Sequence, residues 1–448
     1  MSSMFFDRWL FSYLLYKLCI VPRLICKECL YLSVFMASTL CVGVVHAKEI
    51  YILPSINIET KYDDNIRLMS DKIDGLGGID KSAYGVITSV NAKIGVRSDR
   101  YDVALNNQVV INRYSSDFDL DSEDFFINFT SNFDATEKNR FSLIGDYKQD
   151  TTLTSELDGT GTGRVFDNPI REQWSVSPSW TYLLSDTQLL QANYRHSDIS
   201  YEESGSSNFS DYTIDLFTLS YSQQWLPVLR NFFNVSVMYF DVPEIKNNVI
   251  LDSKIVILDS KRETLEYSID AGVEYQISPT WFASLTAGGR FTNTDITTSA
   301  NLAVPTEKVK TSDSTQGMIF SFSIDKQFET GHAEINYSRS TNPQGDGRLE
   351  LLDRFGVNFN HRFSHNLRFS LMGDISVRSN SGSKDLDDDR TNYRVRPTIS
   401  WLFNKNTRLT GGYQYRRQEF ERNDSVAESN AFFLNFNYQW DKLATQRY

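Results

Sequence analysis

Residues 431–440 read Ala-Phe-Phe-Leu-Asn-Phe-Asn-Tyr-Gln-Trp, and their side chains alternate between two kinds. Every second position is apolar or aromatic: Phe432, Leu434, Phe436, Tyr438 and Trp440. Apart from Phe433, the positions between them carry amides: Asn435, Asn437 and Gln439. Because successive side chains of a β-strand point to opposite sides of the sheet, this stretch predicts a strand with one apolar and one polar face.

The same period of two recurs along the chain after Lys48, for example over residues 265–277 and 393–403. Such segments are longer than the usual strand of about 5 to 6 residues, and they suit a tilted membrane span of about 9 to 11. Aromatic residues make up 13% of a chain that is polar on average. That combination favours a structure whose apolar side chains form a one-sided outer band.

The connections between these segments alternate between short and long. Short turns are predicted at 98–100, 134–139, 184–187, 226–231, 278–280, 329–332, 364–366 and 404–407. Long polar loops are predicted at 63–82, 115–122, 151–169, 201–210, 243–260, 294–311, 341–350, 379–389 and 421–427. Outer-membrane barrels alternate short periplasmic turns with longer outer loops in the same way.

We therefore predict an all-β fold: a closed antiparallel transmembrane β-barrel of about 18 strands, within a range of about 16 to 20. The aromatic strand ending at Trp440 would close the barrel against the first strand and carry the assembly signal, a role that Tyr448 could also serve. Within the loop 243–260, residues 248–251 and 254–258 are apolar enough to form a hairpin outside the membrane or a further strand pair. The second alternative would raise the count to about 20.

The first 47 residues have the pattern of a secretory signal. Cys29 to Val45 is a run of apolar and small residues, and Val45-His46-Ala47 is a small-x-small cleavage site. All four cysteines lie before residue 48. We expect a signal peptide at 1–47, with 1–26 as a doubtful extension, and an outer-membrane barrel at 48–448. A retained membrane anchor is the alternative.

The charge balance excludes nucleic acid as a partner. Residues 1–47 hold four of the 45 basic and two of the 57 acidic residues, so the remainder carries 41 basic against 55 acidic residues. Nucleic-acid binding requires a basic footprint that this chain lacks. Expected partners are instead outer-membrane lipid and lipopolysaccharide, with an anionic polysaccharide and periplasmic export components as further candidates.

The alternation assigns charged side chains to the inside of the barrel. A basic wall is predicted from Arg354, Arg362, Arg368, Arg378, Arg394, Arg396, Arg408 and Arg416, with Asp374 as the main carboxylate among them. An acidic side is predicted from Glu266, Asp270, Glu274, Asp325 and Glu334. Arginines at these positions would attract and orient anions through bidentate contacts. The alternative is that they are ordinary polar filler of a barrel lumen, paired with acidic neighbours.

Other residues carry weaker signals. Acidic runs at 117–124 and 385–389 suit solvated loops, or divalent-cation bridges to lipopolysaccharide. His361 and His365 straddle a predicted turn, and His196 has no serine on the adjoining face of the neighbouring strand. We therefore predict no catalytic residues, no metal site and no cofactor. Aromatic residues at strand ends are predicted to form interfacial girdles: Tyr51, Tyr62, Trp174, Tyr182, Trp225, Trp281, Trp401 and Trp440.

The stretch Thr60-Lys61-Tyr62-Asp63-Asp64-Asn65-Ile66 takes the first predicted strand through an Asp-Asn pair into a long polar loop. A strand over residues 86–96 and a hairpin through Asp99 and Arg100 follow. This pattern resembles the start of bacterial outer-membrane β-barrel proteins associated with exopolysaccharide biosynthesis and export, including barrels linked to PEP-CTERM systems. The resemblance extends from about Tyr51 to Trp440, and only Tyr62 to Ile66 is motif-like.

This resemblance implies a role in polysaccharide secretion without catalytic residues. Together with the charged interior, it predicts a passive outer-membrane conduit for export of an anionic exopolysaccharide. A general diffusion porin for small solutes is one alternative. A non-conducting structural or docking barrel of a polysaccharide secretion system is another.

Overall fold

A computed structural model describes residues 49–70, 81–116, 119–152, 169–202, 209–251, 254–300, 309–345, 347–380, 389–421 and 425–446. The predicted signal segment, residue 117, most of the acidic run 385–389, and Tyr448 lie outside these residues. Within the described part of the chain, no helix is long and apolar enough to cross a membrane.

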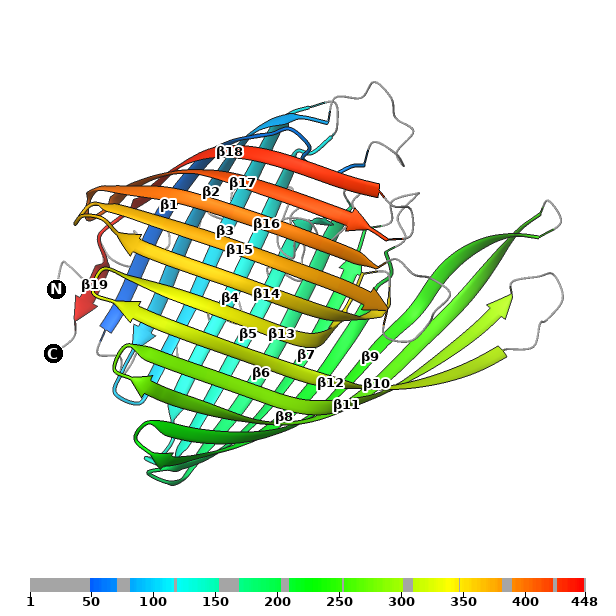
Figure 1. Ribbon diagram of the computed structural model, residues 1–448, viewed down its shortest axis with the longest axis horizontal. Coiled ribbons are helices and arrows are strands. Elements are labelled where there is room, and N and C mark those ends of the chain that lie inside the picture. The colour runs from blue at the N-terminus through cyan, green and yellow to red at the C-terminus, as the bar shows by residue number, and fades with distance from the viewer. Residues whose placement is uncertain are drawn as a thin grey trace, which may run out of the picture.

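Eighteen strands form one closed wall (Figure 1). They are β1 (Glu49–Asp63), β2 (Ala83–Arg97), β3 (Tyr101–Ser115), β4 (Ser122–Asp134), β5 (Asn139–Thr151), β6 (Ile170–Ser185), β7 (Gln188–Tyr201), β8 (Tyr212–Leu226), β9 (Leu229–Leu251), β10 (Lys254–Ser278), β11 (Trp281–Ala300), β12 (Val309–Phe328), β13 (Gly331–Pro343), β14 (Leu349–Arg362), β15 (Leu367–Asn380), β16 (Arg390–Asn404), β17 (Thr407–Phe420) and β18 (Ser425–Gln439). A short β19 (Leu443–Gln446) follows. The predicted fold class and strand count are confirmed.

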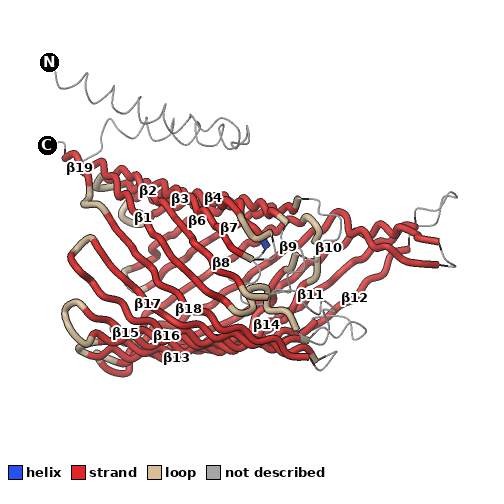
Figure 2. The backbone as a smooth tube through the Cα atoms, turned by 90° about the horizontal axis from the view of Figure 1, so that it is seen from above, coloured by secondary structure: helices blue, strands red, loops and turns tan. Residues whose placement is uncertain are grey.

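The barrel closes where its first and last strands meet. β18 pairs antiparallel with β1 from Ser55 opposite Gln439 to Asp63 opposite Ala431, and Figure 2 shows β1 and β18 side by side. Closure leaves no sheet edge, so the backbone N–H and C=O groups of the wall are paired within the protein rather than left bare in lipid. Residues 432–439 of the predicted closing strand lie in β18, which pairs with β1 and ends at Gln439.

After Gln439 the chain continues along β1 toward the short-turn end. Trp440 N donates to Pro54 O at 3.1 Å, and β19 pairs with the first residues of β1, Glu49 to Ile52. Lys405 Nζ and Asn406 Nδ2, in the β16–β17 turn, donate to Asp441 at 2.9 and 3.0 Å. These two hydrogen bonds hold the pKa of the Asp441 carboxyl below its ordinary value.

All eight short turns fall where the alternation places them. The connection 243–260 differs from a simple loop: β9 runs on to Leu251 and β10 starts at Lys254, and the two remain paired throughout. The segment is a hairpin outside the barrel wall, and the alternative of an additional strand pair is wrong. β11 and β12 are extended beside it, so four strands project beyond the rim (Figure 1).

The two faces of the wall differ as the alternation predicts. In β18 the exposed fraction is 58% for Phe432 and 8% for Phe433. In β10, Tyr267, Ile269, Tyr275 and Ile277 are all exposed on the outside. A closed barrel with an apolar outer surface of this kind is a transmembrane barrel of the bacterial outer-membrane type.

One predicted girdle residue lies on the wrong side. Tyr51 is 4% exposed, and its ring packs directly over Gly95. A Cβ added at Gly95 would lie only 2.2 Å from the ring. It shares the inner face with Arg97, whose guanidinium carbon lies 5.8 Å from the ring centroid. The girdle assignment is therefore wrong for Tyr51, which packs inside the end of the barrel that carries the short turns.

Outward-facing tyrosines near the outer ends of the strands bond carboxylates on neighbouring strands. Tyr337 Oη donates to Asp353 Oδ1 at 2.6 Å, and the Arg339 guanidinium donates to both oxygens of that carboxylate at 2.7 Å. Tyr415 Oη and Arg417 Nη1 each donate to Glu428 Oε1 at 3.1 Å. Rings with a polar tip favour the membrane–water interface, so these clusters mark the outer boundary of the apolar band.

Candidate functional site: the inner face of the barrel

The eight predicted wall arginines all lie on strands β14 to β17, on the side of the sheet opposite the exposed apolar residues. Register and alternation fix this placement. Arg354 precedes outward Phe355, Arg394 precedes outward Val395, and Arg416 stands opposite buried Ser429. The structure divides the eight into two groups that differ in their partners.

Arg394 and Arg354 share one carboxylate in the outer half of the barrel. Arg394 Nε and Nη2 lie 2.9 and 2.7 Å from Asp374 Oδ1, and Arg354 Nη2 lies 3.3 Å from the same oxygen. The Asp374 side chain is only 10% exposed. The three residues form a ladder across β14, β15 and β16 in which two positive charges face one negative charge.

Arg416 belongs to a buried cluster at the seam. Its Nη2 donates to Asp63 Oδ2 at 2.8 Å, to Ile66 O at 3.3 Å and to Ser429 Oγ at 3.1 Å. Asp63 is fully buried and also accepts from Ser429 Oγ at 2.7 Å. Lys61 Nζ lies 3.2 Å from Asp63 Oδ2, so two cations and one hydroxyl compensate this buried carboxylate.

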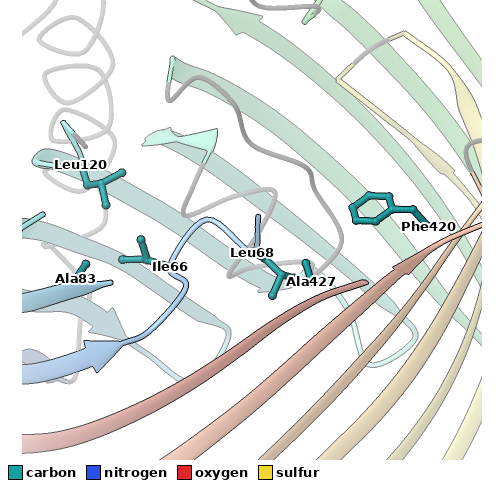
Figure 3. Packing of buried hydrophobic residues seen from close by; sticks show 6 residues of the cluster. All are labelled: Ile66, Leu68, Ala83, Leu120, Phe420 and Ala427. Carbon is teal, nitrogen blue, oxygen red and sulfur yellow. The ribbon is translucent and has the colours of Figure 1, made fainter. Parts of the chain in front are cut away.

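Beyond Asp63 the chain turns inward, and residues 64–70 form what we call the first inward turn. Asn65 organises it: Nδ2 donates to Met69 O and to Glu428 O, and Oδ1 accepts from Met69 N, all at 2.9 Å. Ile66 and Leu68 pack with inner-face residues from other strands, including Ala83, Phe420 and Ala427 (Figure 3). The turn therefore lies against the inner wall at the outer mouth.

Leu68 holds a backbone conformation that favours glycine, with φ at 52°. A branched side chain at positive φ costs roughly 1 to 3 kcal/mol unless its surroundings enforce it. Here the side chain is 4% exposed within the cluster, and Leu68 N donates to Asn65 O at 3.0 Å. Packing and this hydrogen bond offset the strain and hold the turn in place.

A second inward turn, formed by the described residues among 344–348, crosses the mouth from β13 and β14. Arg378 Nη1 bonds Gln344 Oε1 at 2.8 Å and Glu350 Oε2 at 3.2 Å. On the far side, Gly345 O accepts from Ser210 N at 2.7 Å, and Gly347 O accepts from Arg262 Nη1 at 2.7 Å. The two inward turns occupy different parts of the outer mouth and narrow it.

The predicted acidic residues also lie on the inner face, each with a polar partner. Glu266 accepts from Thr292 at 2.9 Å and from Thr341 at 2.7 Å, and lies 3.5 Å from Arg290. The remaining contacts are Asp270 with Asn234, Glu274 with Arg230, Asp325 with His332, and Glu334 with Asn336 and Asn358. Both sides of the interior thus mix charge signs more than sequence reasoning supposed.

The remaining four arginines form a second group, which we call the periplasmic strip: Arg362, Arg368, Arg396 and Arg408. Arg362 ends β14, and Arg368 and Arg408 each lie one residue inside a strand that starts at a short turn. Arg396 lies deeper, opposite Met372, with its guanidinium carbon 4.3 Å from the centroid of the Phe433 ring. Among the described residues, no carboxylate lies within ion-pair distance of these four.

Sequence reasoning missed several residues of this interior. Asp63 and Glu350, the partners of Arg416 and Arg378, fall at the ends of the predicted loops 63–82 and 341–350. Arg290 and Arg230 were overlooked on the acidic side. All four have the inward parity of their strands, so the alternation contained the signal once the strands were extended to their full length.

The described residues contain no group of three or more His, Cys, Asp or Glu side chains placed to hold a metal ion. His196 lies on the outer surface, 2.7 Å from Asp215, which also accepts from Tyr194 Oη at 2.5 Å. Among the described residues, the side chains recorded in contact with His196 are Asp215 and the ring of Trp174.

No protein family model and no curated protein sequence matches this chain. Among solved structures it is similar to the ferric yersiniabactin uptake receptor FyuA from Yersinia pestis, with 7% identity, a TM-score of 0.48, and coverage of 86% of this chain and 80% of that one. It is also similar to OccAB3 of Acinetobacter baumannii, with 10% identity, a TM-score of 0.43, and coverage of 88% and 99%. At these identities and TM-scores, no substrate, partner or activity carries over to this chain.

Proposed function

We propose that this protein is a passive outer-membrane channel for anionic solutes. The observation that carries the proposal is the inner face of β14 to β17, where eight arginines lie behind an apolar outer band. Rings and walls of arginine favour anions in pores because they lower the electrostatic cost of dehydrating and moving a negative charge. The channel would need no cofactor.

An anionic exopolysaccharide leaving the cell is the substrate that the sequence resemblance implies. A chain of acidic sugars would contact several guanidinium groups in succession along the wall, which supports this substrate. A general porin for small anions would use the same wall, and it remains the second candidate.

Planar-bilayer recording of the purified, refolded barrel tests the proposal. We expect ohmic, anion-selective conductance, reduced by an added acidic polysaccharide if that polymer enters the pore. Conductance indifferent to the polymer would favour the small-solute porin.

The two inward turns favour a third candidate, a filled docking barrel, because they narrow the outer mouth. That candidate predicts no conductance even after residues 65–70 and 344–348 are deleted. A correctly folded barrel that shows no conductance after these deletions would overturn the channel proposal.

A further inference from the structure

We propose that the periplasmic strip, Arg362, Arg368, Arg396 and Arg408, is a binding subsite for oxyanions, that is, for carboxylate or phosphate groups of a solute. This inference rests on the proposed channel and names the part of the wall that engages the solute. It assigns a different role to the arginines of the outer half.

The first step is the contrast in pairing. Other inward arginines near the same end of the barrel have carboxylate partners: Arg97 with Asp102 at 2.7 Å, Arg140 with Asp134 at 2.5 Å, and Arg230 with Glu274 at 3.5 Å. In the part of the barrel that the structure describes, the four strip arginines have none. Neutral residues adjoin them on the inner face: Ser370, Met372, Ser400, Thr410 and Asn437. Asp374, diagonal to Arg396, is bonded to Arg394 and Arg354.

The second step is an unfavourable arrangement that the fold retains. Arg362 and Arg368 stand directly opposite each other across β14 and β15, on the same face. Like charges in this position repel each other and weaken the strand pair. Both side chains are exposed, and the repulsion would be removed by any anion that bridges them.

The third step is the fixed position of Arg396. Its guanidinium stacks on Phe433, which is 8% exposed and packs over Gly412, where a Cβ would lie 2.3 Å from the ring. Stacking on an aromatic face restrains the guanidinium while leaving its in-plane N–H donors open. Those donors are the ones that grip the two oxygens of a carboxylate or phosphate.

The strip thus combines three features. Its arginines have no described carboxylate partner, Arg362 and Arg368 repel each other, and the guanidinium of Arg396 is restrained by Phe433. Arg362, Arg368 and Arg408 lie at the end with the short turns, so an anion would meet them on entering from the periplasm or on leaving toward it, and Arg396 lies further along that path, about midway along β16. The ligand class is set by the donors: planar guanidinium groups favour oxyanions over chloride.

The test uses the full barrel in planar bilayers and in detergent. The double variants Arg362→Gln/Arg368→Gln and Arg396→Gln/Arg408→Gln each remove two charges from the strip. Arg417→Gln is the matched control, because it lies on β17 beside Arg416 but faces outward. Circular dichroism and thermal melting establish that each variant is folded.

In a potassium chloride gradient, we expect each double variant to lower the chloride-to-potassium permeability ratio by about threefold or more, while the control keeps the wild-type ratio. Inorganic phosphate and gluconate added from the periplasmic side should reduce the wild-type current and affect the variants less. Block by phosphate alone would assign the subsite to phosphates, and block by gluconate alone would assign it to carboxylates.

Folded, conducting variants with wild-type selectivity and wild-type block would overturn the subsite and leave the channel standing. A wild-type barrel that does not conduct would overturn the channel instead. The subsite then stands or falls on whether phosphate or gluconate raises the melting temperature of the wild type and not of the double variants.

Discussion

The two groups of arginines on β14 to β17 share strands and a face, yet they differ in their partners. In the outer half, Arg416 and Arg378 are nearly inaccessible, at 4% and 3% exposed, and their donors are used on carboxylates and on the inward turns. In the periplasmic strip the side chains are open, apart from stacked Arg396, and have no described carboxylate. What separates the groups is whether a neighbouring strand or turn places a carboxylate on the same face.

Arginines that share one inner face are therefore not one functional unit. A guanidinium enclosed with its counter-ion contributes little net field to a solute, because the pair is nearly neutral at a distance. An exposed guanidinium without a partner acts on any anion within about 10 Å at moderate salt. Single substitutions in each group therefore have different expected effects on stability and on selectivity.

Replacing Arg416 should cause the largest loss of stability. Arg416→Gln leaves the buried Asp63 carboxylate with Lys61, whose Nζ lies 3.2 Å away, as its remaining described cation. Breaking one side of a buried ion pair costs up to about 3 to 5 kcal/mol. Urea unfolding in detergent micelles, followed by circular dichroism, measures the change. Arg408→Gln on the same strand and face is the control. If both variants unfold at the same urea concentration, the outer arginine is not structural.

Removing the side chain that organises the first inward turn should both destabilise and open the mouth. Asn65→Ala deletes the hydrogen bonds to Met69 and to Glu428 O, at a cost of about 1 to 3 kcal/mol. A released turn would widen the outer entrance, so single-channel conductance should rise. Conductance that does not change in a folded variant would show that this turn does not limit passage.

Neutralising Asp374 should leave Arg354 and Arg394 without the carboxylate that they share, which makes them more like the arginines of the periplasmic strip. Asp374→Asn removes the negative charge shared by Arg394 and Arg354, and we expect a loss of about 1 to 3 kcal/mol together with stronger anion preference. Reversal potentials in a salt gradient measure the preference. Asp353→Asn, on the outer surface, is the matched control. A weaker anion preference would contradict the proposed role of pairing.

Much of this architecture is predictable from the sequence because inward and outward side chains alternate along every strand of a barrel. Alternation gives both the strands and their faces, and short turns against long loops give orientation, which is why the eighteen strands and the inward parity of Arg354 or Arg396 follow from the residues. Even Tyr51 has the parity of inward Ser55 and Asn57. It was misplaced because an aromatic residue at a strand end suits a girdle as well as an interior.

Partner choice is not predictable in the same way. Asp63 and Arg416 are separated by 353 positions, and they meet only because the first and last strands close the barrel in one register. The inward path of residues 64–70 depends on a hydrophobic cluster whose residues come from several strands. The identity of Leu68 alone does not predict its positive φ. Long-range packing therefore decides which arginines are bound, whereas local pattern decides only which way they point.

Arg362→Gln should have a small effect on stability, but its sign distinguishes an arginine kept for a solute from one kept for folding. Because Arg362 and Arg368 repel each other, Arg362→Gln should stabilise the barrel slightly, by about 0.2 to 1 kcal/mol, while it weakens anion selectivity. The same substitution at Arg378, in the outer half, should instead destabilise it, since Glu350 and Gln344 lose their donor. Parallel urea unfolding and reversal-potential measurements on the two variants give the comparison. A site that gains stability and loses selectivity has been kept for the solute, because folding alone would favour its removal. If Arg362→Gln destabilised the barrel as Arg378→Gln does, the two ends of the wall would have the same structural role.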